Sequence, residues 1–447
     1  MNSTNKAEAV AILGAGAWGL STAVHLLESG YTDISVFDQA SEIPSPYSGA
    51  YDLNKIVRAE YEDEFYTELA LRAINKWKTP FWGANFHQLG YVLATSGAAP
   101  EKAVKHLQTA LLSVKDHPAF APKITELNTP GEFKSIYWQF TGPMAGFQGY
   151  HNRLAGYAHS ANAMLDTYRY LSGRGVKFVL GPHDGKVVKL VYNGGPGDVS
   201  SERRCTGFRV ESGKTYEARR TILCLGSWAA TLIPEIASYV VAKSWSVAHI
   251  QLTERECDYL RGIPVLNVRD LGFFFEPDPV TKLFKLCPLG AGYVNSDKTT
   301  GISLPPGEAL STPRDYIPAI DEAKLRRLLQ QTLPWLADRP FVEKKMCWFA
   351  DTADSEYTVD FVPNTGDSLI VLSGDSGHGF KMMPIVGEWV VKLLEDGKQT
   401  LKRWRWRHSQ GSKGGDEWGD DVSWRVGTTR ELKEVIEEQR RAEKSRL

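Results

Sequence analysis

The sequence predicts an α/β fold in which a parallel, doubly wound sheet is joined to a second, mostly antiparallel α+β region. The apolar run 10–13 passes through a glycine-rich turn directly into a helix-like segment, which is typical of a doubly wound unit. A second apolar run, 34–37, ends in Asp38, where such a unit places its second strand. The alternation is lost at about residues 60–150 and 234–338, so we expect the antiparallel region there.

The turn after the first strand, Gly14-Ala15-Gly16-Ala17-Trp18-Gly19, has the spacing of a dinucleotide pyrophosphate site. Gly14 permits the tight turn, Gly16 lets the backbone approach the phosphates, and Gly19 lets the helix pack closely on the strand. The positive end of that helix then faces the pyrophosphate. Asp38 lies where a carboxylate is expected to accept hydrogen bonds from a ribose. The motif therefore predicts a dinucleotide, and by itself it fits NAD as well as FAD.

The middle of the chain is expected to return to this nucleotide-binding unit. We expect a helix over 150–175 that stops at glycine, a strand over 176–180, and two strands of an antiparallel insert at 187–192 and 205–210. An apolar strand that starts at Arg220 then ends on Gly226. A strand that closes on glycine after such an excursion is typical of two-dinucleotide-fold flavoproteins, so it favours FAD.

The remaining elements follow from periodicity and turn residues. We expect a helix over 65–77, a hairpin from 272–277 and 283–287, strands at 347–352 and 369–373, and a helix over about 385–394. The first N–H groups of that last helix are expected beside the ligand of the glycine turn. A C-terminal helix is expected to begin with a capping box, Thr428-x-x-Glu431.

Composition excludes several classes of protein. The 447 residues contain 52 Lys and Arg against 53 Asp and Glu, which argues against nucleic-acid binding and against a polybasic membrane surface. The chain shows neither an apolar stretch of membrane-spanning length nor a signal peptide, so we expect a soluble, intracellular protein. Five scattered cysteines indicate neither a disulfide framework nor a zinc site. The chain ends in Ser445-Arg446-Leu447, close to the S-K-L address, so we expect peroxisomal import, with a cytoplasmic location as the alternative.

Together these segments resemble the sarcosine oxidase-like family of FAD amine oxidases, and most closely its fungal fructosyl amino acid oxidase (amadoriase) branch. The motifs that carry the resemblance are Gly14 to Gly19, Asp52-Leu53-Asn54-Lys55-Ile56, Gly272-Phe273-Phe274-Phe275-Glu276-Pro277-Asp278, Cys347-Trp348-Phe349-Ala350-Asp351-Thr352 and Ser376-Gly377-His378-Gly379-Phe380-Lys381. The resemblance spans nearly the whole chain and implies a FAD-binding Rossmann-like (two-dinucleotide-fold) domain with a mostly antiparallel α+β substrate domain. The implied ranges are 1–60, 148–228 and 343–400 for the FAD-binding domain, 61–147 and 229–342 for the substrate domain, and 401–447 for a C-terminal tail that packs on the body.

The resemblance also implies how the cofactor is held. In the family, a cysteine at the position of Cys347 joins the flavin 8α-methyl group through a thioether (8α-S-cysteinyl FAD), whereas an ordinary free cysteine would simply be buried. Lys285 matches a lysine that contacts flavin N5 through water and serves oxygen activation, and Lys55 matches a second cation near the flavin face. A cation there stabilises negative charge that develops on O2. Either lysine could instead be an ordinary strand or loop cation. The implied cofactor-binding residues are Gly14, Gly16, Trp18, Gly19, Asp38, Gly226, Cys347, Gly377, Gly379, Phe380 and Lys381.

The substrate site departs from the amadoriase pattern. Arg58 and Lys381 match the cation pair that holds the substrate carboxylate in sarcosine oxidase, and His378 matches its active-site histidine; each could also be a residue outside the site. Amadoriases carry arginine at the position of His378 and an acidic residue at the position of Leu289. Without that carboxylate, each sugar hydroxyl buried without a partner would cost about 1–3 kcal/mol.

We therefore expect a FAD-dependent oxidase that converts the C–N bond of a secondary α-amino acid, first of all an N-methyl amino acid, to an imine while O2 becomes H2O2. The imine could be hydrolysed, or captured by an internal nucleophile as in fungal alkaloid pathways that use related enzymes. A fructosyl amino acid oxidase is the main alternative, and an NAD(P)-dependent dehydrogenase and a non-catalytic flavin-binding protein are two further ones. We expect a monomer whose partners are the small-molecule amine, O2 and the peroxisomal import receptor, with no nucleic acid, membrane or metal.

Overall fold

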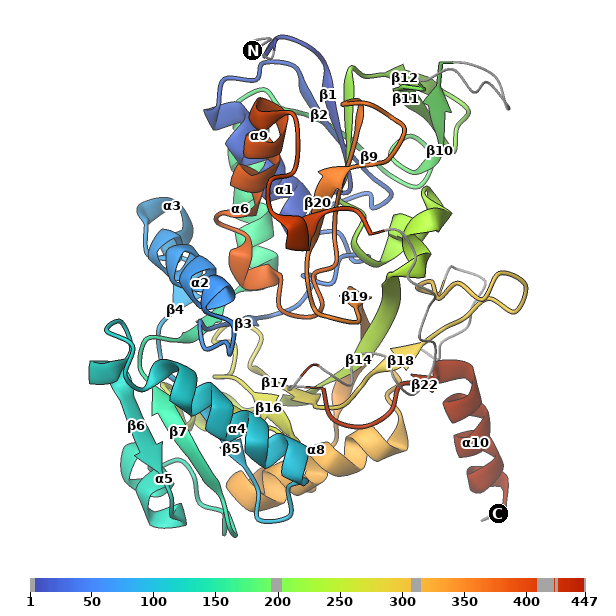
Figure 1. The fold of residues 1–447 in the computed structure, drawn as a ribbon. Helices are drawn as coiled ribbons and strands as arrows, with labels where there is room; N and C mark the ends of the chain where they lie inside the picture. Colours follow the sequence, from blue (N-terminus) through green and yellow to red (C-terminus); the bar gives the residue numbers. More distant parts are fainter. Residues whose placement is uncertain (1–4, 194–202, 307–314, 408–421, 423–424, 446–447) are drawn as a thin grey trace.

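A six-stranded sheet forms the upper half of the molecule in the computed structural model (Figure 1). The structure describes residues 5–193, 203–306, 315–407, 422 and 425–445. The spatial order of the strands is β20 (Thr358–Phe361), β21 (Leu369–Ser373), β13 (Arg220–Leu223), β1 (Val10–Leu13), β2 (Ile34–Asp38) and β9 (Lys177–Leu180). Only β20 pairs antiparallel, so the expected parallel sheet is confirmed.

Each face of this sheet is covered by a different kind of layer. The helices α1 (Ala17–Glu28), α6 (Ser160–Gly173) and α9 (Val386–Asp396) pack on one face, where Ile12 and Val36 are buried. The other face is covered by an antiparallel sheet of β10 (Val187–Tyr192), β11 (Cys205–Val210) and β12 (Thr215–Glu217). There the rings of Phe37 and Phe208 lie 4.7 Å apart. Burial on both faces explains the continuous apolar strands of the sequence.

A ten-stranded, mostly antiparallel sheet forms the second half of the molecule (Figure 1). Its order is β22 (Arg430–Glu431), β18 (Tyr293–Val294), β14 (Val240–Gln251), β17 (Leu283–Pro288), β16 (Gly272–Phe274), β15 (Val265–Val268), β5 (Tyr91–Thr95), β7 (Gln148–Asn152) and β6 (Ile124–Leu127), with β19 (Val342–Thr352) also paired to β14. The helix α8 (Ala319–Thr332) packs on β16 and β17, and α4 (Glu101–Val114) packs on β5. The expected α/β fold with a second antiparallel α+β region is therefore confirmed, whereas the domain boundaries stay a prediction.

Shorter elements complete the fold. The remaining helices are α2 (Glu64–Trp77), α3 (Pro80–Gly83), α5 (Pro130–Ile136), α7 (Glu254–Tyr259) and α10 (Leu432–Lys444). The remaining strands are β3 (Lys55–Val57), β8 (Gly156–Ala158) and β4 (Phe86–His87), which form a small sheet in that order. The 3-10 turns are η1 (Ala121–Lys123), η2 (Gly226–Thr231), η3 (Pro234–Ser238), η4 (Pro334–Leu336), η5 (Phe380–Met382) and η6 (Lys402–Trp404). No helix among the described residues combines the length and apolarity needed to cross a membrane.

Three local expectations are wrong. The helix expected over 150–175 begins only at Ser160, because the residues before it pair as β7 and β8. Glycines allow that pairing: a Cβ on Gly149 would lie 2.2 Å from the Leu93 carbonyl oxygen, and one on Gly156 would lie 2.0 Å from that of His87. Tertiary pairing thus overrides the helical pattern.

The start of α9 does not border the ligand site. Its Gly387 N–H donates to Ser21 Oγ at 3.1 Å, so this helix end packs on α1. The expected capping box before α10 is also absent, because the helix starts at Leu432 after Glu431 has paired with β18. The Glu431 carboxylate accepts from the N–H of Ser296 at 3.2 Å instead. Of the expected targeting tripeptide, Arg446 and Leu447 lie outside the described residues.

Candidate active site

A cavity of about 510 Å³ lies between the two large sheets. From the parallel sheet it is bordered by Leu13, Asp38 and Ser373, at the carboxyl ends of β1, β2 and β21. From the ten-stranded sheet it is bordered by residues of β14, β15, β16, β17 and β19. Since ligands of doubly wound sheets bind at the carboxyl ends of the strands, this cavity is the candidate site for both cofactor and substrate.

The first glycine turn fits a dinucleotide. Gly14 has φ +106°, and a Cβ there would lie 2.4 Å from the Cys224 carbonyl oxygen. A Cβ on Gly16 would lie 3.1 Å from Ser48 Oγ and would narrow the cavity. Since α1 has no side-chain cap, its first N–H groups are available to an anion. Ser373 Oγ is buried at the cavity and, among the described residues, has no hydrogen-bond partner, so it also suits a polar ligand.

Asp38 borders the cavity and also accepts a hydrogen bond from the first glycine turn. Its carboxylate accepts hydrogen bonds from the N–H groups of Ala15 at 2.8 Å and Ala40 at 2.9 Å, and from Ser45 Oγ at 3.0 Å. Burial nevertheless raises the pKa of Asp38 above its usual value. Each oxygen of an ionised carboxylate can accept more than one hydrogen bond, so the expected contact with a ribose stays a prediction that this geometry permits.

The second glycine turn, 374–379, lies against two tryptophans. A Cβ on Gly377 would lie 2.4 Å from the Trp245 ring, and one on Gly379 would lie 2.6 Å from the Trp18 ring. Trp18 Nε1 also donates to the Gly379 carbonyl oxygen at 3.1 Å. Trp18, Gly226, Gly377 and Phe380 border the cavity, whereas Gly19 and Gly379 lie behind its wall. These last two glycines therefore act by close packing rather than by facing the ligand.

Asp375 in this turn was given no role by sequence reasoning. Its carboxylate borders the cavity and accepts from the N–H groups of Ala350 at 3.0 Å and Gly377 at 3.1 Å. Burial raises its pKa to about 6, although these hydrogen bonds oppose the shift. Asp375 and Asp38 are the only carboxylates among the described residues that border the cavity, and both are held by backbone N–H groups of the glycine turns.

Cys347 on β19 borders the cavity and differs from the other four cysteines, which are buried. Its Sγ lies 3.7 Å from Lys55 Nζ and 3.5 Å from the Gly49 carbonyl oxygen. The thiol thus faces the space that the glycine turns border and lies beside the Lys55 ammonium. This place fits the expected cysteinyl link, which stays a prediction.

The two expected catalytic lysines meet at one buried carboxylate. We call Asp52, Lys55, Lys285 and Lys345 the Asp52 cluster. Asp52 Oδ2 lies 2.5 Å from Lys285 Nζ and 2.8 Å from Lys55 Nζ, and Oδ1 lies 4.0 Å from Lys345 Nζ. Although burial opposes ionisation, these three cations hold the pKa of Asp52 well below its usual value. Sequence reasoning missed Asp52, although its place three residues before Lys55 was a usable signal.

The expected substrate residues also meet. Arg58 and Lys381 border the cavity, and the Lys381 Nζ donates to Tyr61 Oη at 2.7 Å and to the His378 carbonyl oxygen at 2.8 Å. The Arg58 guanidinium lies 5.1 Å from the centre of the Tyr61 ring and donates to the Glu60 carbonyl oxygen. Sequence reasoning missed two further polar residues of this wall, Asn267 and Arg269, because no motif contains them.

His378 borders the cavity but has protein partners on both ring nitrogens. Its Nε2 lies 3.0 Å from the Ser355 carbonyl oxygen and so donates, while Nδ1 accepts from the hydroxyls of Tyr61 and Tyr357, each at 2.9 Å. Burial and the neighbouring Lys381 hold its pKa well below the usual value. His378 is therefore neutral, and a direct contact with substrate stays a prediction.

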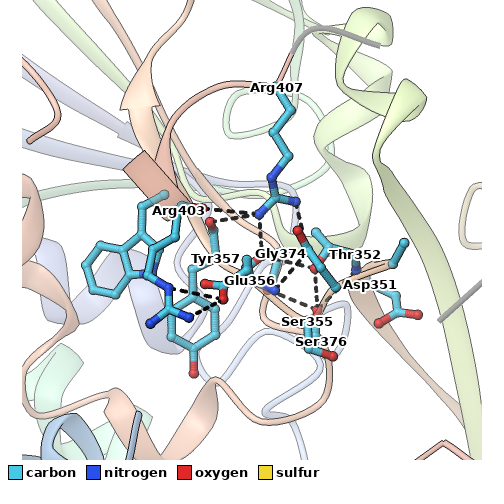
Figure 2. A network of polar contacts seen from close by, with 12 residues as sticks. Asp351, Thr352, Ser355, Glu356, Tyr357, Gly374, Ser376, Arg403 and Arg407 are labelled. Atoms are coloured by element: carbon cyan, nitrogen blue, oxygen red, sulfur yellow. Dashed lines mark hydrogen bonds and ion pairs between the residues drawn. The ribbon is translucent and has the colours of Figure 1, made fainter. Parts of the chain in front are cut away.

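The chain's C-terminal part supports this histidine. Figure 2 shows the turn that carries Ser355 and Tyr357, together with arginines that follow α9. Arg403 Nη2 lies 2.7 Å from Glu356 Oε1, and Arg407 Nη2 donates to the Glu356 carbonyl oxygen at 3.2 Å. These contacts hold the turn in place, so the tail acts on the site indirectly.

Comparisons with known proteins show which family the chain resembles. The FAD dependent oxidoreductase family model matches residues 9–393. L-saccharopine oxidase of Schizosaccharomyces pombe is 32% identical over 435 residues, which cover 93% of this chain and 95% of the relative. Amino acid oxidase imqH of Aspergillus flavus is 27% identical over 458 residues, which cover 87% and 92%. Among solved structures, the fructosamine oxidase amadoriase II of Aspergillus fumigatus has a TM-score of 0.85 at 29% identity, covering 96% of this chain and 97% of that one.

Proposed function

The chain belongs to the FAD dependent oxidoreductase family, and we propose that it oxidises the C–N bond of a secondary α-amino acid whose carboxylate is held by Arg58 and Lys381. The sequence-based resemblance to sarcosine oxidases and amadoriases is confirmed, and the enzyme is an FAD-dependent oxidase that acts on amino acids. The proposal concerns which amino acid it oxidises. It starts from the one observation that two cations, rather than carboxylates, border the cavity beside Tyr61.

Arg58 and Lys381 suit a carboxylate. A guanidinium can donate two parallel hydrogen bonds to a carboxylate, and a nearby ammonium adds charge. Burial and the charge of Arg58 lower the pKa of Lys381 well below its usual value, so a bound anion would restore its charged form. The neutral His378 cannot compete as a third cation. The α-carboxylate therefore orients the substrate, with the amine and the adjacent C–H directed toward the Asp52 cluster and Cys347.

Bound FAD supplies the acceptor for a hydride from that C–H and returns two electrons to O2. In balance, the amine loses two electrons and two protons to become an imine, and O2 gains both to become H2O2. Water can then hydrolyse the imine to a carbonyl compound and a primary amine. Lys285, held by Asp52, provides a fixed cation for the negative charge that develops on O2.

The name of the relative from Schizosaccharomyces pombe supports a secondary amine, because L-saccharopine is a secondary amine with amino acid carboxylates. N-methyl amino acids are the smallest members of this class. Deglycation of fructosyl amino acids is the second candidate, favoured by the fold shared with amadoriase II at a TM-score of 0.85. Against it, Leu289 borders the cavity where amadoriases carry an acidic residue. The two carboxylates that border the cavity within the described residues, Asp38 and Asp375, already accept hydrogen bonds from N–H groups of the glycine turns.

The test is anaerobic bleaching of the flavin absorbance. N-methyl amino acids and L-saccharopine are compared with fructosyl-glycine and fructosyl-valine at equal concentration. Bleaching by the secondary amino acids, lost in Arg58→Gln and kept in Arg261→Gln, is the expected result. Arg261 is a matched control because it pairs with Asp258 on an exposed turn away from the cavity. Bleaching only by the fructosyl compounds would contradict the proposal and establish deglycation.

We also propose that FAD is attached covalently to Cys347. Bond formation between Sγ and the 8α-carbon breaks one S–H and one C–H bond, and the two electrons and two protons end on O2 as H2O2. The expected result is a yellow polypeptide after acid precipitation and a colourless one in Cys347→Ser, with Cys257→Ser as control. Colour released from the wild type by acid would contradict the link.

Peroxisomal import through Ser445-Arg446-Leu447 is the last part of the proposal, and catalase there would remove the H2O2. The measurement is the location of an N-terminal fluorescent fusion with and without these three residues. Peroxisomal fluorescence that depends on them is expected, and diffuse fluorescence of the intact fusion would favour the cytoplasmic alternative.

A further inference from the structure

We propose that Arg425, in the C-terminal part of the chain, is a positioning residue that fixes the tautomer of His378 and, through it, the place of the Lys381 ammonium. The function proposed above gives Lys381 the substrate carboxylate, so the consequence for substrate binding rests on that function, whereas the tautomer does not. Arg425 lies outside the motifs that carry the family resemblance, and sequence reasoning gave it no role.

Arg425 contacts the turn that joins β19 to β20. The residue is 4% exposed, and its Nη2 donates to the Thr352 carbonyl oxygen at 2.8 Å and to Ser355 Oγ at 2.9 Å. Nη1 donates to the Ala353 carbonyl oxygen at 3.2 Å, and Nη2 also pairs with the Asp351 carboxylate. Figure 2 shows Asp351, Thr352 and Ser355 of this turn close together. A planar guanidinium can span several acceptors of one turn, whereas a lysine ammonium is a compact point of charge.

The ion pair of Arg425 is anchored in the ten-stranded sheet. Asp351 on β19 is buried, and its Oδ2 lies 3.2 Å from Lys243 Nζ on β14. Lys243 also donates to Thr429 Oγ1 at 2.8 Å. One buried carboxylate thus binds a cation of the sheet and a cation of the C-terminal part, so the strands of the sheet set the position of Arg425.

Ser355 is held by Arg425 in a backbone conformation that residues with a side chain disfavour. Its φ of +59° lies in the left-handed region, which persists where the surroundings hold it. The contacts that hold it include the Arg425 guanidinium on Oγ and its own N–H, which donates to the Thr352 carbonyl oxygen at 3.2 Å. In this conformation the Ser355 carbonyl oxygen lies 3.0 Å from His378 Nε2. Arg425 therefore helps to determine where that carbonyl points.

The Ser355 carbonyl determines which ring nitrogen of His378 carries the proton. A carbonyl oxygen can only accept, so Nε2 donates and Nδ1 accepts. The Tyr61 hydroxyl donates its single proton to Nδ1 at 2.9 Å, and its oxygen accepts from Lys381 Nζ at 2.7 Å. With the proton on Nδ1 instead, Tyr61 Oη would face two donors, the imidazole and the ammonium, and its contact with Lys381 would weaken. The contacts therefore form a relay from Arg425 through Ser355, His378 and Tyr61 to Lys381.

The tautomer can be measured directly. Protonated and unprotonated imidazole nitrogens differ widely in chemical shift, so the nitrogen NMR spectrum of holoenzyme with nitrogen-15-labelled histidine reports it, and His378→Asn identifies the resonances of His378. We expect a proton on Nε2 in the wild type and a mixture of tautomers in two variants. Arg425→Lys keeps a cation beside Asp351 but loses the planar fork that spans the turn, and Ser355→Ala removes only the hydroxyl that the guanidinium holds. The wild-type tautomer in both variants would overturn the proposal.

Arg430→Gln is the matched control. Arg430 is an exposed arginine of the same part of the chain, and it pairs with Glu438 on α10. This variant should keep the tautomer of the wild type. Denaturant unfolding of the holoprotein identifies a purely structural role: a lower stability of Arg425→Lys with an unchanged tautomer and unchanged ligand affinity would reduce Arg425 to a residue that only stabilises the fold.

Ligand binding connects the tautomer to the substrate site. Tetrahydrofuran-2-carboxylate and its carboxamide, which carry an ether oxygen in place of the amine, are titrated into the holoenzyme while the visible flavin spectrum is followed. The wild type should prefer the carboxylate, and Arg425→Lys and Ser355→Ala should reduce this preference by about 10-fold, the value of one charge-assisted hydrogen bond.

The two measurements separate failure of the relay from failure of the proposed function. No preference for the carboxylate in the wild type would contradict the proposed function, while the NMR spectrum still tests the role of Arg425. A full preference in both variants, together with the wild-type tautomer, would leave the proposed function in place and overturn the relay.

Discussion

Two pairs of cations border the same cavity, Lys55 with Lys285 and Arg58 with Lys381. Among the described residues, only the first pair has a carboxylate within ion-pair distance. In the Asp52 cluster, one buried carboxylate lies within 2.8 Å of both Lys55 and Lys285. In the second group, Arg58 and Lys381, which we call the cation pocket, the contacts include a tyrosine hydroxyl, a tyrosine ring and carbonyl oxygens. The cluster can therefore hold its lysines without a ligand, whereas the proposed function has a substrate anion complete the cation pocket.

The pKa values of the lysines express this difference in part, since burial lowers the pKa of Lys285 even though Asp52 raises it. Although burial lowers it, the pKa of Lys55 is raised by Asp52. Burial and Arg58 hold the pKa of Lys381 well below its usual value, because the opposing effect of Glu60 is smaller than theirs. A buried cation with a fixed counter-charge serves position and catalysis, and one without it indicates where a substrate anion binds.

Among the substitutions that test this difference between the two groups, Asp52→Asn should have the largest effect. It leaves the buried Lys285 and the half-buried Lys55 without their counter-charge, so we expect the free energy of unfolding to fall by about 3–5 kcal/mol. Denaturant unfolding of the holoprotein measures it. Lys345→Met is the control, because Lys345 is partly exposed and 4.0 Å from Asp52, where a pair contributes about 0–1 kcal/mol. Equal losses in the two variants would show that the cluster does not depend on Asp52.

Lys285→Met tests the catalytic side of the cluster. The fixed cation for charge on O2 is lost, so kcat/KM for O2 should fall by about 10²–10³-fold, whereas anaerobic bleaching by the amine should change much less. Oxygen-electrode rates and stopped-flow bleaching measure the two steps separately. Lys282→Met, on the turn before β17, should leave both unchanged. A loss confined to bleaching would place Lys285 with the substrate instead of with O2.

Arg58→Gln tests the cation pocket. Removing a charge-assisted hydrogen bond to the substrate carboxylate should raise KM by about 10–100-fold, with a smaller change in kcat. Steady-state rates at saturating O2 measure both parameters, and Arg261→Gln is the control. An unchanged KM for every secondary amino acid would remove Arg58 from the carboxylate clamp.

For Lys381 we predict the smallest effect, which is a dependence of carboxylate binding on pH. Tetrahydrofuran-2-carboxylate has an ether oxygen in place of the amine, so it binds as a carboxylate and cannot be oxidised. Since the pKa of Lys381 is low in the free site, rising pH removes its charge, and affinity should fall by up to about tenfold per pH unit above that pKa. Calorimetry in two buffers should show proton uptake on binding, which Lys381→Met abolishes. Affinity independent of pH in the wild type would mean that Lys381 keeps its proton without the ligand.

Some elements of the fold were predictable because their causes are local. The strand, glycine turn and helix of 10–28 are contiguous, and the hairpin of β16 and β17 joins neighbouring apolar runs. The strands at 148–158 were not, because Gly149 and Gly156 act through carbonyl oxygens of distant residues. The same distinction holds in the site: Cys347, Lys55, Lys285, Arg58 and Lys381 come from motifs, whereas Asn267 and Arg269 do not.

By itself, the sequence predicted the glycine turn for a dinucleotide, the FAD oxidase class and most of the charged residues that border the cavity. Each of these depends on residue type and short spacing. Only the tertiary structure decided which of these charges are compensated. Tyr61 and His378, which hydrogen-bond at 2.9 Å, are 317 residues apart along the chain, and Lys285 is 231 residues from Asn54, whose carbonyl it contacts. Burial and counter-charge arise from such distant contacts, so they appear only when both sheets are assembled around the cavity.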